Sequence, residues 1–331
     1  MTPPVKIGMI SMAHGHAHAY MEALLAMPQA DIAGIAHPSR DEVADVLART
    51  GIPYYADYRE LLQTDIDAVV ICSENALHAR HTIDAAMAGK HILCEKPLGI
   101  EVGEMTRMID ACREGGVQLM TAFPCRYLTA AEEARQAILR GEIGEILAFK
   151  GTNRGTFPGS WFADSARSGG GALLDHSVHV LDLLHWMMPG AAVREVYAYA
   201  ANRFQPEHEI DDAGMLHVTF DNGACGVIDT SWSRPRTFPT WGDVTLEIVG
   251  SAGVLSLDAF AQHNEVYSDA AGKGAYAYWG DGMDELMVRA FVDAVRSGRP
   301  VPITGADGLH AARAALAGYD SVRSGQPVRL A

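Results

Sequence analysis

Two patterns of apolar and polar positions divide the chain. Up to about residue 124, short apolar runs without polar alternation are separated by segments whose apolar residues recur at helical spacing. Strands of that kind are buried on both faces, as in a parallel sheet covered by helices. The pattern predicts strands at VKIGMI, DIAGIA, DAVVIC, HILCEK and VQLMTAF, and helices at AYMEALLAM, RDEVADVLART, HARHTIDAAMAGK and VGEMTRMIDACREGG. We therefore expect a Rossmann-type dinucleotide-binding domain over residues 1–124.

The second part, residues 125–331, shows longer stretches in which apolar and polar positions alternate. This alternation predicts antiparallel strands of an open sheet at EVYAYAANRF, AGMLHVTF, ACGVIDTSWS, DVTLEIVG and GVLSLDAF. Helices are expected at LLDHSVHVLDLLHWMM and near residues 283–297 and 305–323. The expected fold class is α/β, a parallel-sheet Rossmann domain followed by an α+β domain with an open, mostly antiparallel sheet for substrate binding and oligomerisation. No flexible linker is visible, so we expect the domains to pack closely.

Charge and hydropathy narrow the choice of partner and compartment. The 331 residues carry a formal net charge of −15, which repels a phosphodiester backbone, and no Lys/Arg cluster is visible. No apolar stretch reaches the ~20 residues that cross a bilayer, and the N-terminus lacks a signal-peptide pattern. We expect a cytoplasmic protein with a small-molecule partner and no nucleic-acid or membrane partner.

The five cysteines are widely scattered and include no C-x-x-C pair. Neither a disulfide framework nor a cysteine zinc site is indicated, so buried reduced thiols are expected.

The stretch AGKHILCEKPLGI is the most specific in the sequence. Together with DAVVICSENALHARHTIDAAMAGKH before it, and with FPCRYL, RGEIGEI, SGGGALLDHSVHVLDLLHW, GDVTLEIVGSAGVLSL and the SGRPVPITG tail after it, it resembles the Gfo/Idh/MocA family of NAD(P)-dependent oxidoreductases. The resemblance spans nearly the whole chain in the same order. It implies a dehydrogenase or reductase acting on a secondary alcohol or ketone of a sugar, inositol or related polyol, assembled as a homo-oligomer, either a dimer or a tetramer.

Lys96 is the first catalytic candidate. It follows a predicted strand at the edge of the sheet where ligands bind in open parallel sheets. An ammonium there can hydrogen-bond a substrate hydroxyl or carbonyl, and partial burial lowers its pKa toward the range useful for proton transfer. The resemblance implies a specially shaped peptide between Lys96 and Pro97, with cis as one form. The alternative is a surface lysine paired with Glu95.

Asp175, His179 and Asp182 form the second catalytic group. Their spacing of i, i+4 and i+7 places all three on one face of a helix. The resemblance assigns Asp175 and His179 to the site with the lysine. Imidazole can accept the hydroxyl proton as hydride leaves the same carbon, while Asp175 orients the substrate or biases the charges of its neighbours. Asp182 either fixes the His179 ring or is a capping or outer carboxylate.

The segment ISMAHGHAHAY stands where a Rossmann domain carries a glycine-rich turn. Either Ser11, Ala13 and His16 replace the three glycines, or a one-residue deletion brings Gly15 to the third. We favour a rewritten nucleotide loop in which His14 and His16 assist the pyrophosphate at a helix N-terminus, because no carboxylate accompanies the histidines at a metal-motif spacing. One alternative is a metal pair of His14 and His18 joined by His176 or His179; the other is packed or solvated histidines.

Other cofactor contacts are expected along the same edge. His37 stands where an acidic residue usually binds the adenosine ribose, and Ser39 and Arg40 follow, so NADP is favoured over NAD, although Arg40 also fits an exposed helix start. In CSENALH, Glu74 replaces the proline usual in relatives. The remaining predicted contacts are Cys72, Ser73, Asn75, His78 and Glu95, of which Asn75 and His78 could instead cap the next helix.

Weaker substrate-contact candidates are Arg126, Trp161 and His176, each of which could instead serve packing. The triple glycine at residues 169–171 would let backbone approach a ligand closely, or would simply start a helix. Two other function classes stay open: a non-catalytic nucleotide-binding regulator, and a metal-dependent hydrolase or lyase that uses the His-rich loop.

Overall fold

The computed structural model describes residues 3–330, which fall into two compact units. The first unit comprises Met1–Pro124 with Asp284–Leu309, and the second comprises Cys125–Met283 with His310–Ala331. The first boundary lies where the sequence pattern changes. The segment Asp284–Leu309, which the sequence placed in the second domain, packs with the first unit instead.

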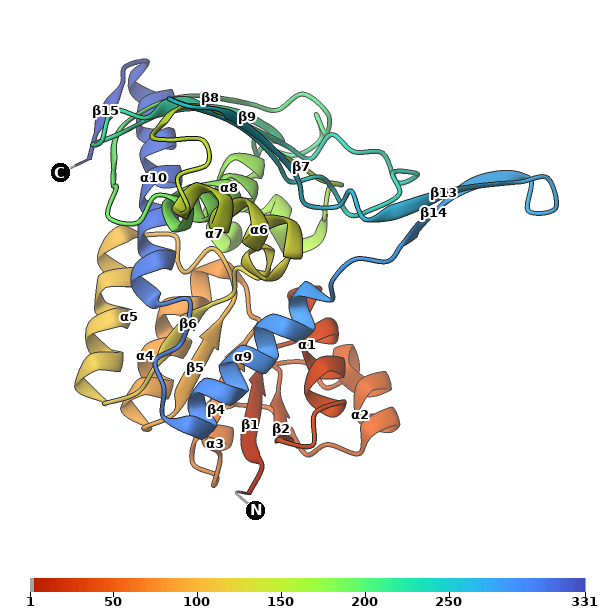
Figure 1. Cartoon of the computed structure of the whole chain (residues 1–331). Coiled ribbons are helices and arrows are strands. Elements are labelled where there is room, and N and C mark those ends of the chain that lie inside the picture. The colour runs from red at the N-terminus through yellow and green to blue at the C-terminus, as the bar shows by residue number, and fades with distance from the viewer. Residues whose placement is uncertain (1–2, 331) are drawn as a thin grey trace. The chain divides into compact units, whose positions relative to one another are not determined.

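The first unit is built on a six-stranded sheet in which all pairs are parallel (Figure 1). Its strand order is β3-β2-β1-β4-β5-β6, which is the Rossmann order. The predicted parallel sheet is confirmed, with a sixth strand, β3, that is too short at two residues to give a periodic signal. The strands are β1 (Val5–Ile10), β2 (Ala30–Ala36), β3 (Tyr54–Tyr55), β4 (Ala68–Ile71), β5 (His91–Cys94) and β6 (Leu119–Thr121).

Helices flank this sheet on both sides (Figure 1). In α5 the buried residues Met105, Met108 and Cys112 follow the spacing that marks a core-facing stripe. The predicted helices are confirmed with shifted ends. The helical segments are α1 (His16–Leu25), η1 (Asp41–Val43), α2 (Ala44–Thr50), α3 (Tyr58–Leu62), η2 (Asn75–Leu77), α4 (His78–Met87), α5 (Val102–Glu114) and α9 (Met283–Ser297).

The second unit contains a seven-stranded sheet of order β12-β11-β7-β10-β9-β8-β15. Only the β10–β7 pair is parallel among its described strands, so the mostly antiparallel prediction is confirmed. The strands are β7 (Ile146–Arg154), β8 (Val193–Ala201), β9 (Ala213–Phe220), β10 (Cys225–Ser231), β11 (Thr245–Gly250), β12 (Val254–Asp258) and β15 (Val328–Arg329). The sequence analysis did not predict β7. The second half of this strand buries Gly151, Thr152 and Asn153, so the buried positions are not apolar and show no alternation of apolar and polar residues.

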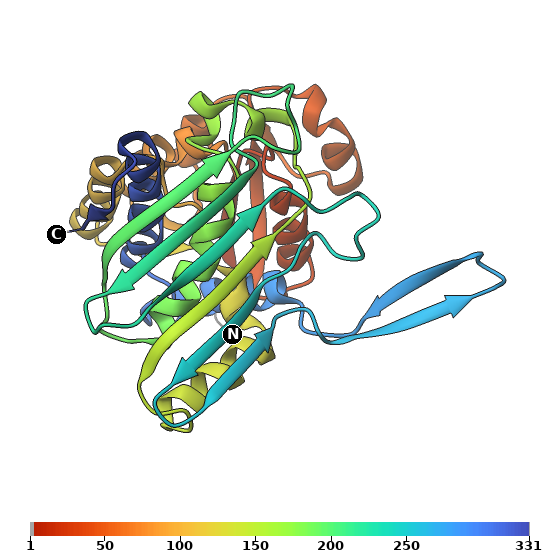
Figure 2. The same cartoon turned by 90° about the horizontal axis from the view of Figure 1, so that it is seen from above.

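Helix α8 (Ala172–Met187) packs under this sheet, and 14 of its 16 residues are buried, as expected for a helix enclosed on all sides. Figure 2 looks onto the opposite face, over which no helix of the second unit's described residues lies. The other helical segments are η3 (Pro124–Tyr127), α6 (Thr129–Leu139), η4 (Ser160–Ala163), α7 (Ser165–Ser168) and α10 (Gly305–Ser324).

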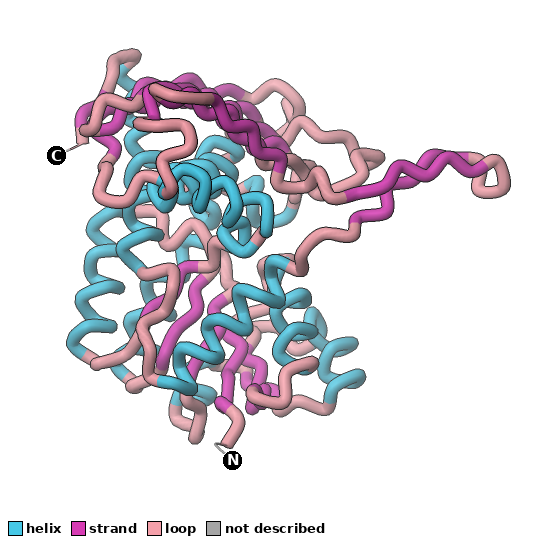
Figure 3. The backbone as a smooth tube through the Cα atoms, in the orientation of Figure 1, coloured by secondary structure: helices cyan, strands magenta, loops and turns pink. Residues whose placement is uncertain are grey.

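A two-stranded ribbon of β13 (His263–Ser268) and β14 (Lys273–Tyr278) extends from the second unit (Figure 3). The five cysteines form no disulfide in the described chain, and four of them are buried. Across residues 3–330, the helices are all too short or too polar to span a bilayer.

Candidate functional site

The turns that follow β1, β4 and β5 gather at the carboxyl edge of the parallel sheet in the first unit. Strands β1 and β4 are neighbours in the sheet but not in the chain, and such a switch point is where open α/β sheets bind ligands. The His14 N–H donates to the Cys72 carbonyl oxygen at 3.0 Å, and the Ser11 N–H donates to the Ala36 carbonyl oxygen at 2.7 Å. The structure thus brings the predicted cofactor residues of three separate strands to one edge.

Serine takes the place of the first glycine in the β1 turn. Ser11 has a φ of 69°, in the left-handed region that favours glycine. Its hydroxyl oxygen accepts a hydrogen bond from the Ala13 N–H at 3.1 Å, which holds the turn. Gly15 is different, since a Cβ added there would meet no protein atom within 4 Å. Packing of α1 on the sheet therefore does not require a glycine at position 15.

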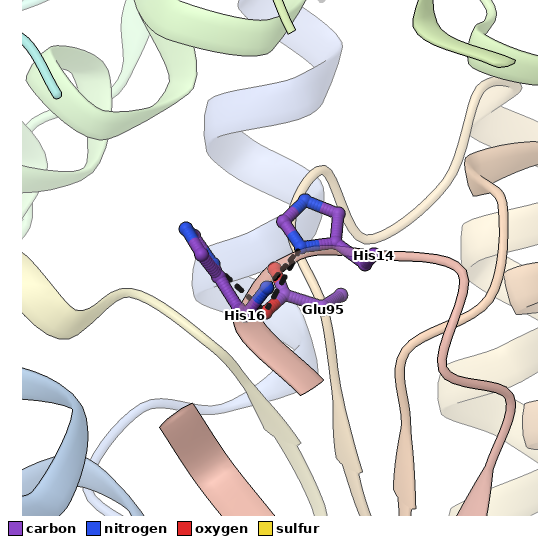
Figure 4. Close-up of side chains that lie close together, drawn as sticks. All are labelled: His14, His16 and Glu95. Atoms are coloured by element: carbon purple, nitrogen blue, oxygen red, sulfur yellow. Dashed lines mark hydrogen bonds and ion pairs between the residues drawn. The ribbon is translucent and has the colours of Figure 1, made fainter. Parts of the chain in front are cut away.

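His14, His16 and Glu95 form a cluster at this edge (Figure 4). The Glu95 Oε1 atom lies 3.1 Å from His16 Nδ1 and 3.9 Å from His14 Nδ1. His14 and Glu95 are buried, whereas the His16 side chain is 36% exposed. The three side chains can each offer a ligand atom to a metal ion, with these atoms within 4.8 Å of one another.

The alternative of a metal pair of His14 and His18 on one helix is not formed, because α1 begins at His16 and His14 lies in the preceding turn. His14 is buried and His18 is exposed. The partner of His14 is instead Glu95, the carboxylate whose absence from the local sequence argued against a metal site.

Electrostatics hold the cluster in a charged state. Burial alone would raise the pKa of Glu95, but the neighbouring imidazoles of His14 and His16 lower that pKa well below its usual range. Burial lowers the pKa of His16, and the Glu95 carboxylate outweighs it, so that the net pKa is raised. The second carboxylate oxygen of Glu95 accepts the Lys96 N–H at 3.0 Å. Glu95 is therefore a buried carboxylate anchored from two directions.

Lys96 lies two residues beyond the end of β5 and is buried, which excludes the alternative of a surface lysine. The Lys96–Pro97 peptide is cis, one of the forms that the family resemblance implied. His78 binds this segment to the β4 turn, since its Nδ1 lies 2.9 Å from the Pro97 carbonyl oxygen and its Nε2 lies 3.1 Å from that of Ser73.

His78 and Cys72 have no exposed surface. Both ring nitrogens of His78 face backbone carbonyls, and the N-cap position of α4 is Leu77, so His78 does not cap that helix. It positions the Lys96–Pro97 segment. Ser73 and Asn75 are also buried on this edge, and the Ser73 hydroxyl contacts His81 Nδ1 at 3.0 Å.

The end of β2 carries an acidic group that sequence reasoning missed. His37 is buried, its Nδ1 accepts the Met12 N–H at 3.2 Å, and its Nε2 lies 3.0 Å from Glu42 Oε2. Glu42 lies in η1, beyond the position where an acidic residue usually follows the strand. Ser39 is half-buried, while Arg40 is exposed and its guanidinium lies 5.2 Å from the centre of the Tyr54 ring.

In the second unit, α8 places Asp175, His179 and Asp182 as the spacing predicts, and all three are buried. Arg126 on η3 makes a bidentate ion pair with Asp182. Its Nε donates to Oδ2 at 2.8 Å, and its Nη2 donates to Oδ1 at 2.5 Å. Asp182 therefore serves as the counter-charge of a buried arginine. His179 Nδ1 lies 3.9 Å from the Cys125 sulfur.

Asp175 is held by Trp232, which follows β10, and by its neighbour His176 on α8. Its Oδ2 accepts the indole N–H of Trp232 at 3.1 Å and lies 3.3 Å from His176 Nε2. His176 Nδ1 faces the Asn153 carbonyl oxygen at 3.0 Å. The sequence did not single out Trp232, because its proximity to Asp175 depends on how β10 packs on α8.

One aromatic ring, that of Trp241, lies beside this part of α8. Trp241 lies with its ring centre 5.8 Å from that of His176 and 6.2 Å from that of His179. Trp161 is buried and stacks on Phe162 at 3.8 Å.

The triple glycine before α8 is explained by internal packing. A Cβ on Gly171 would lie 1.8 Å from the Asp211 carbonyl oxygen, and one on Gly170 would lie 2.3 Å from the Tyr319 hydroxyl. Side chains at these positions would collide with the second unit itself, so close approach of a ligand is not needed to account for them.

Comparison with known proteins finds matches in both parts of the chain. Residues 5–123 match an oxidoreductase family with an NAD-binding Rossmann fold, and residues 131–256 match the GFO/IDH/MocA C-terminal domain. Among similar proteins, myo-inositol 2-dehydrogenase of Thermotoga maritima is 30% identical, with 98% of this chain and 98% of the relative covered.

Two solved structures share the fold over nearly the whole chain. GenD2 from gentamicin A biosynthesis, in complex with NAD, has a TM-score of 0.92 at 25% identity and covers 100% of this chain and 97% of its own. Levoglucosan dehydrogenase, in complex with NADH and levoglucosan, has a TM-score of 0.84 at 25% identity, and the match covers 98% of this chain and 99% of the dehydrogenase chain. Both complexes contain NAD or NADH, and the sequence-based preference for NADP finds no support in them.

Proposed function

The chain belongs to the Gfo/Idh/MocA family of NAD-binding oxidoreductases, and we propose that it is a dehydrogenase or reductase acting on a secondary alcohol or ketone of a sugar, inositol or related polyol. The observation that carries the proposal is the buried Lys96, two residues beyond the end of β5, at the ligand-binding edge of a sheet with the Rossmann strand order. The relatives named for inositol and levoglucosan support the substrate class.

The residues of this edge fit a dinucleotide. Helix α1 is ten residues long and has no acidic residue in its first turn, so its N-terminal N–H groups and dipole favour a pyrophosphate. The open space beside Gly15 leaves room for the phosphates. We assign cofactor contacts to Ser11, Ala13, His14, Gly15 and His16 on the β1 turn, and to Ser73, Asn75 and Glu95 on the neighbouring turns.

We propose NAD(H) rather than NADP(H) as the cofactor. His37 holds the Glu42 carboxylate at the end of β2, where an acidic group accepts hydrogen bonds from the ribose and repels a 2′-phosphate. Arg40, the residue that favoured NADP, is directed to the face of Tyr54.

The catalytic roles follow from the chemistry of three side chains. Bound NAD(H) supplies or accepts the hydride. In the direction of oxidation, Lys96 donates a hydrogen bond to the substrate oxygen, and His179 takes the hydroxyl proton as the C–H hydride leaves the same carbon. Asp175, which Trp232 and His176 hold in place, orients the substrate hydroxyl.

We propose His176 and Trp161 as substrate contacts, and a positioning role for Arg126. The Arg126 guanidinium donates two hydrogen bonds to Asp182, and this ion pair anchors η3 to α8. A buried pair of this kind stabilises local structure only while both partners are present.

The experiment combines cofactor binding with turnover. NADH and NADPH are titrated by fluorescence, and polyols and keto-sugars, including myo-inositol and levoglucosan, are screened for cofactor turnover in wild type, Lys96→Met and His179→Asn. We expect both variants to lose about 100-fold or more in kcat/KM while binding NADH within a few-fold of wild type.

Lys6→Met is the matched control, because Lys6 is an exposed lysine of the same unit, paired with Asp65. It should leave turnover unchanged. Absence of NADH binding, or turnover by Lys96→Met at the wild-type rate, would overturn the proposal.

A further inference from the structure

The cluster of His14, His16 and Glu95 joins two ring nitrogens and one carboxylate oxygen on the first unit (Figure 4). The carboxylate comes from the end of β5, and the two histidines come from the turn before α1 and from its first residue. Two histidines and a carboxylate form a ligand set of catalytic zinc and non-haem iron sites, in which the remaining coordination positions stay open. The imidazoles select transition metals over Mg²⁺ and Ca²⁺.

We infer that His14, His16 and Glu95 form a binding site for one divalent transition-metal ion of the Zn²⁺ or Co²⁺ class. This inference concerns the chain without nucleotide or substrate, and it does not depend on the proposed oxidoreductase activity.

The distances suit a metal after a small contraction. Around a tetrahedral zinc with bonds of 2.0–2.1 Å, neighbouring ligand atoms lie about 3.3–3.4 Å apart. The Nδ1 of His16 is 3.1 Å from Glu95 Oε1, and the Nδ1 of His14 is 3.9 Å from the same oxygen. Binding therefore requires His14 to approach Glu95 by about 0.5 Å, and the two ring nitrogens, which lie within 4.8 Å of each other, to reach the same spacing. His14 Nδ1 also accepts the His16 N–H at 3.2 Å, and ligation by that atom would replace this hydrogen bond.

Groups around the cluster orient its ligands. The oxygen of Glu95 that does not face the histidines accepts the Lys96 N–H at 3.0 Å. Outer hydrogen bonds of this kind fix the orientation of a carboxylate ligand. The Tyr20 hydroxyl, 3.4 Å from His16 Nδ1, would be displaced from that nitrogen by the metal.

A second carboxylate acts on the cluster. Besides Glu95, the Asp284 carboxylate at the start of α9 acts electrostatically on His16, while the Lys96 ammonium opposes it. Asp284 Oδ1 is buried and makes no hydrogen bond to any described residue. The 36% exposure of the His16 side chain provides a path for an ion from solvent.

The test uses the full chain after dialysis against a chelator, with no nucleotide added. Co²⁺ is titrated and followed by its visible d–d absorption, and Zn²⁺ binding is measured by calorimetry. We expect about one ion per chain, with an affinity that falls at least about 10-fold in His16→Asn and in His14→Asn. His16→Asn is the primary variant because His16 is half-exposed. Circular dichroism and the Tm of this variant are measured to check that it folds.

His18→Asn is the matched control, since His18 lies on the same helix and is exposed. It should bind Co²⁺ and Zn²⁺ within about 2-fold of wild type. The inference is overturned if wild type binds no stoichiometric ion, if binding survives in His16→Asn and His14→Asn, or if His18→Asn loses it equally. None of these outcomes bears on NADH binding or turnover, so the two proposals fail separately.

Discussion

His81 on α4 has a charge state that depends on folding. Burial lowers its pKa to about 4, and the nearby His78 and Arg80 act in the same direction. Its ring packs edge-on against Tyr58, with ring centres 4.3 Å apart, and its Nδ1 contacts the Ser73 hydroxyl. The folded protein thus holds a neutral imidazole next to the β4 turn.

This depressed pKa predicts acid sensitivity. The unfolded chain takes up the His81 proton near pH 6.5, and the folded chain takes it up only near pH 4. The contribution of His81 to the free energy of unfolding is therefore fully present above pH 6.5 and is lost as the pH falls from 6.5 to 4. Between pH 7.5 and 4.5 the loss from this one group is about 2.5 kcal/mol. Urea unfolding at the two pH values should show a smaller difference in His81→Asn than in wild type. His18→Asn should behave as wild type, and an unchanged difference in His81→Asn would contradict the prediction.

Glu42 gives a prediction on cofactor choice. Because its carboxylate stands at the end of β2 beside His37, Glu42→Gln should remove a repulsion of the order of 1 kcal/mol from a 2′-phosphate. The ratio of the NADPH Kd to the NADH Kd should fall about 5-fold. Fluorescence titration of both nucleotides measures the ratio. Glu60→Gln is the control, at an exposed position of the same unit, and should leave this ratio of Kd values unchanged. An unchanged ratio in Glu42→Gln would exclude a role of Glu42 in cofactor choice.

At the scale of a single element, the start of α8 is capped from a distant part of the chain. The N-cap residue is Gly171, which has no side chain to offer. Asp211 takes its place, because its carboxylate accepts the N–H groups of Gly171 and Leu173 at 3.0 and 2.9 Å and the Tyr319 hydroxyl at 2.9 Å. The helix that carries Asp175 and His179 is thereby fixed at its first turn.

Asp211→Ala should lower the free energy of unfolding by about 2 kcal/mol, because it leaves the Leu173 N–H and the Tyr319 hydroxyl without their acceptor and the Gly171 N–H with only the Tyr319 hydroxyl oxygen, at 2.9 Å. Denaturant unfolding monitored by circular dichroism measures the change. Asp164→Ala removes an exposed cap of short α7, the acceptor of the Ala166 N–H, and should cost less than half as much. Equal losses in the two variants would argue against a special role for Asp211.

At the scale of the whole molecule, the face of the seven-stranded sheet seen in Figure 2 suggests self-association. Large side chains on this sheet are exposed, among them Tyr197, Tyr199, Met215 and Val249. Tyr199 and Met215 are cross-strand partners, so they present one continuous apolar surface. Large exposed apolar side chains that lie together mark protein–protein contacts, and we propose that a second copy of the chain covers this part of the face, in a dimer or tetramer.

Met215→Lys should shift the assembly toward smaller species, since it places a charge in the centre of that surface. Sedimentation velocity measures the distribution of species. Met87→Lys makes the same exchange at an exposed position on α4 of the first unit and should leave the assembly intact. A monomeric wild type, or an assembly that Met215→Lys does not change, would refute the proposal.

The sequence by itself determined the class of both sheets and most of the helices, because burial along one element leaves a period of 2 or 3.6 in the residues of that element. It also determined that Asp175, His179 and Asp182 share one face of α8. It missed β7, whose buried half is small and polar, the two-residue strands β3 and β15, and the mostly exposed ribbon of β13 and β14.

Only the tertiary structure decided which distant residues meet. The contact of His16 with Glu95, the contact of Glu42 with His37 and the capping of α8 by Asp211 leave no local spacing to detect. Each is set by strand order, by the place where a helix begins, or by the packing of a loop on a helix. The physical reason is that periodicity records whether a side chain is buried, whereas the identity of its neighbour depends on how separate elements are arranged in space.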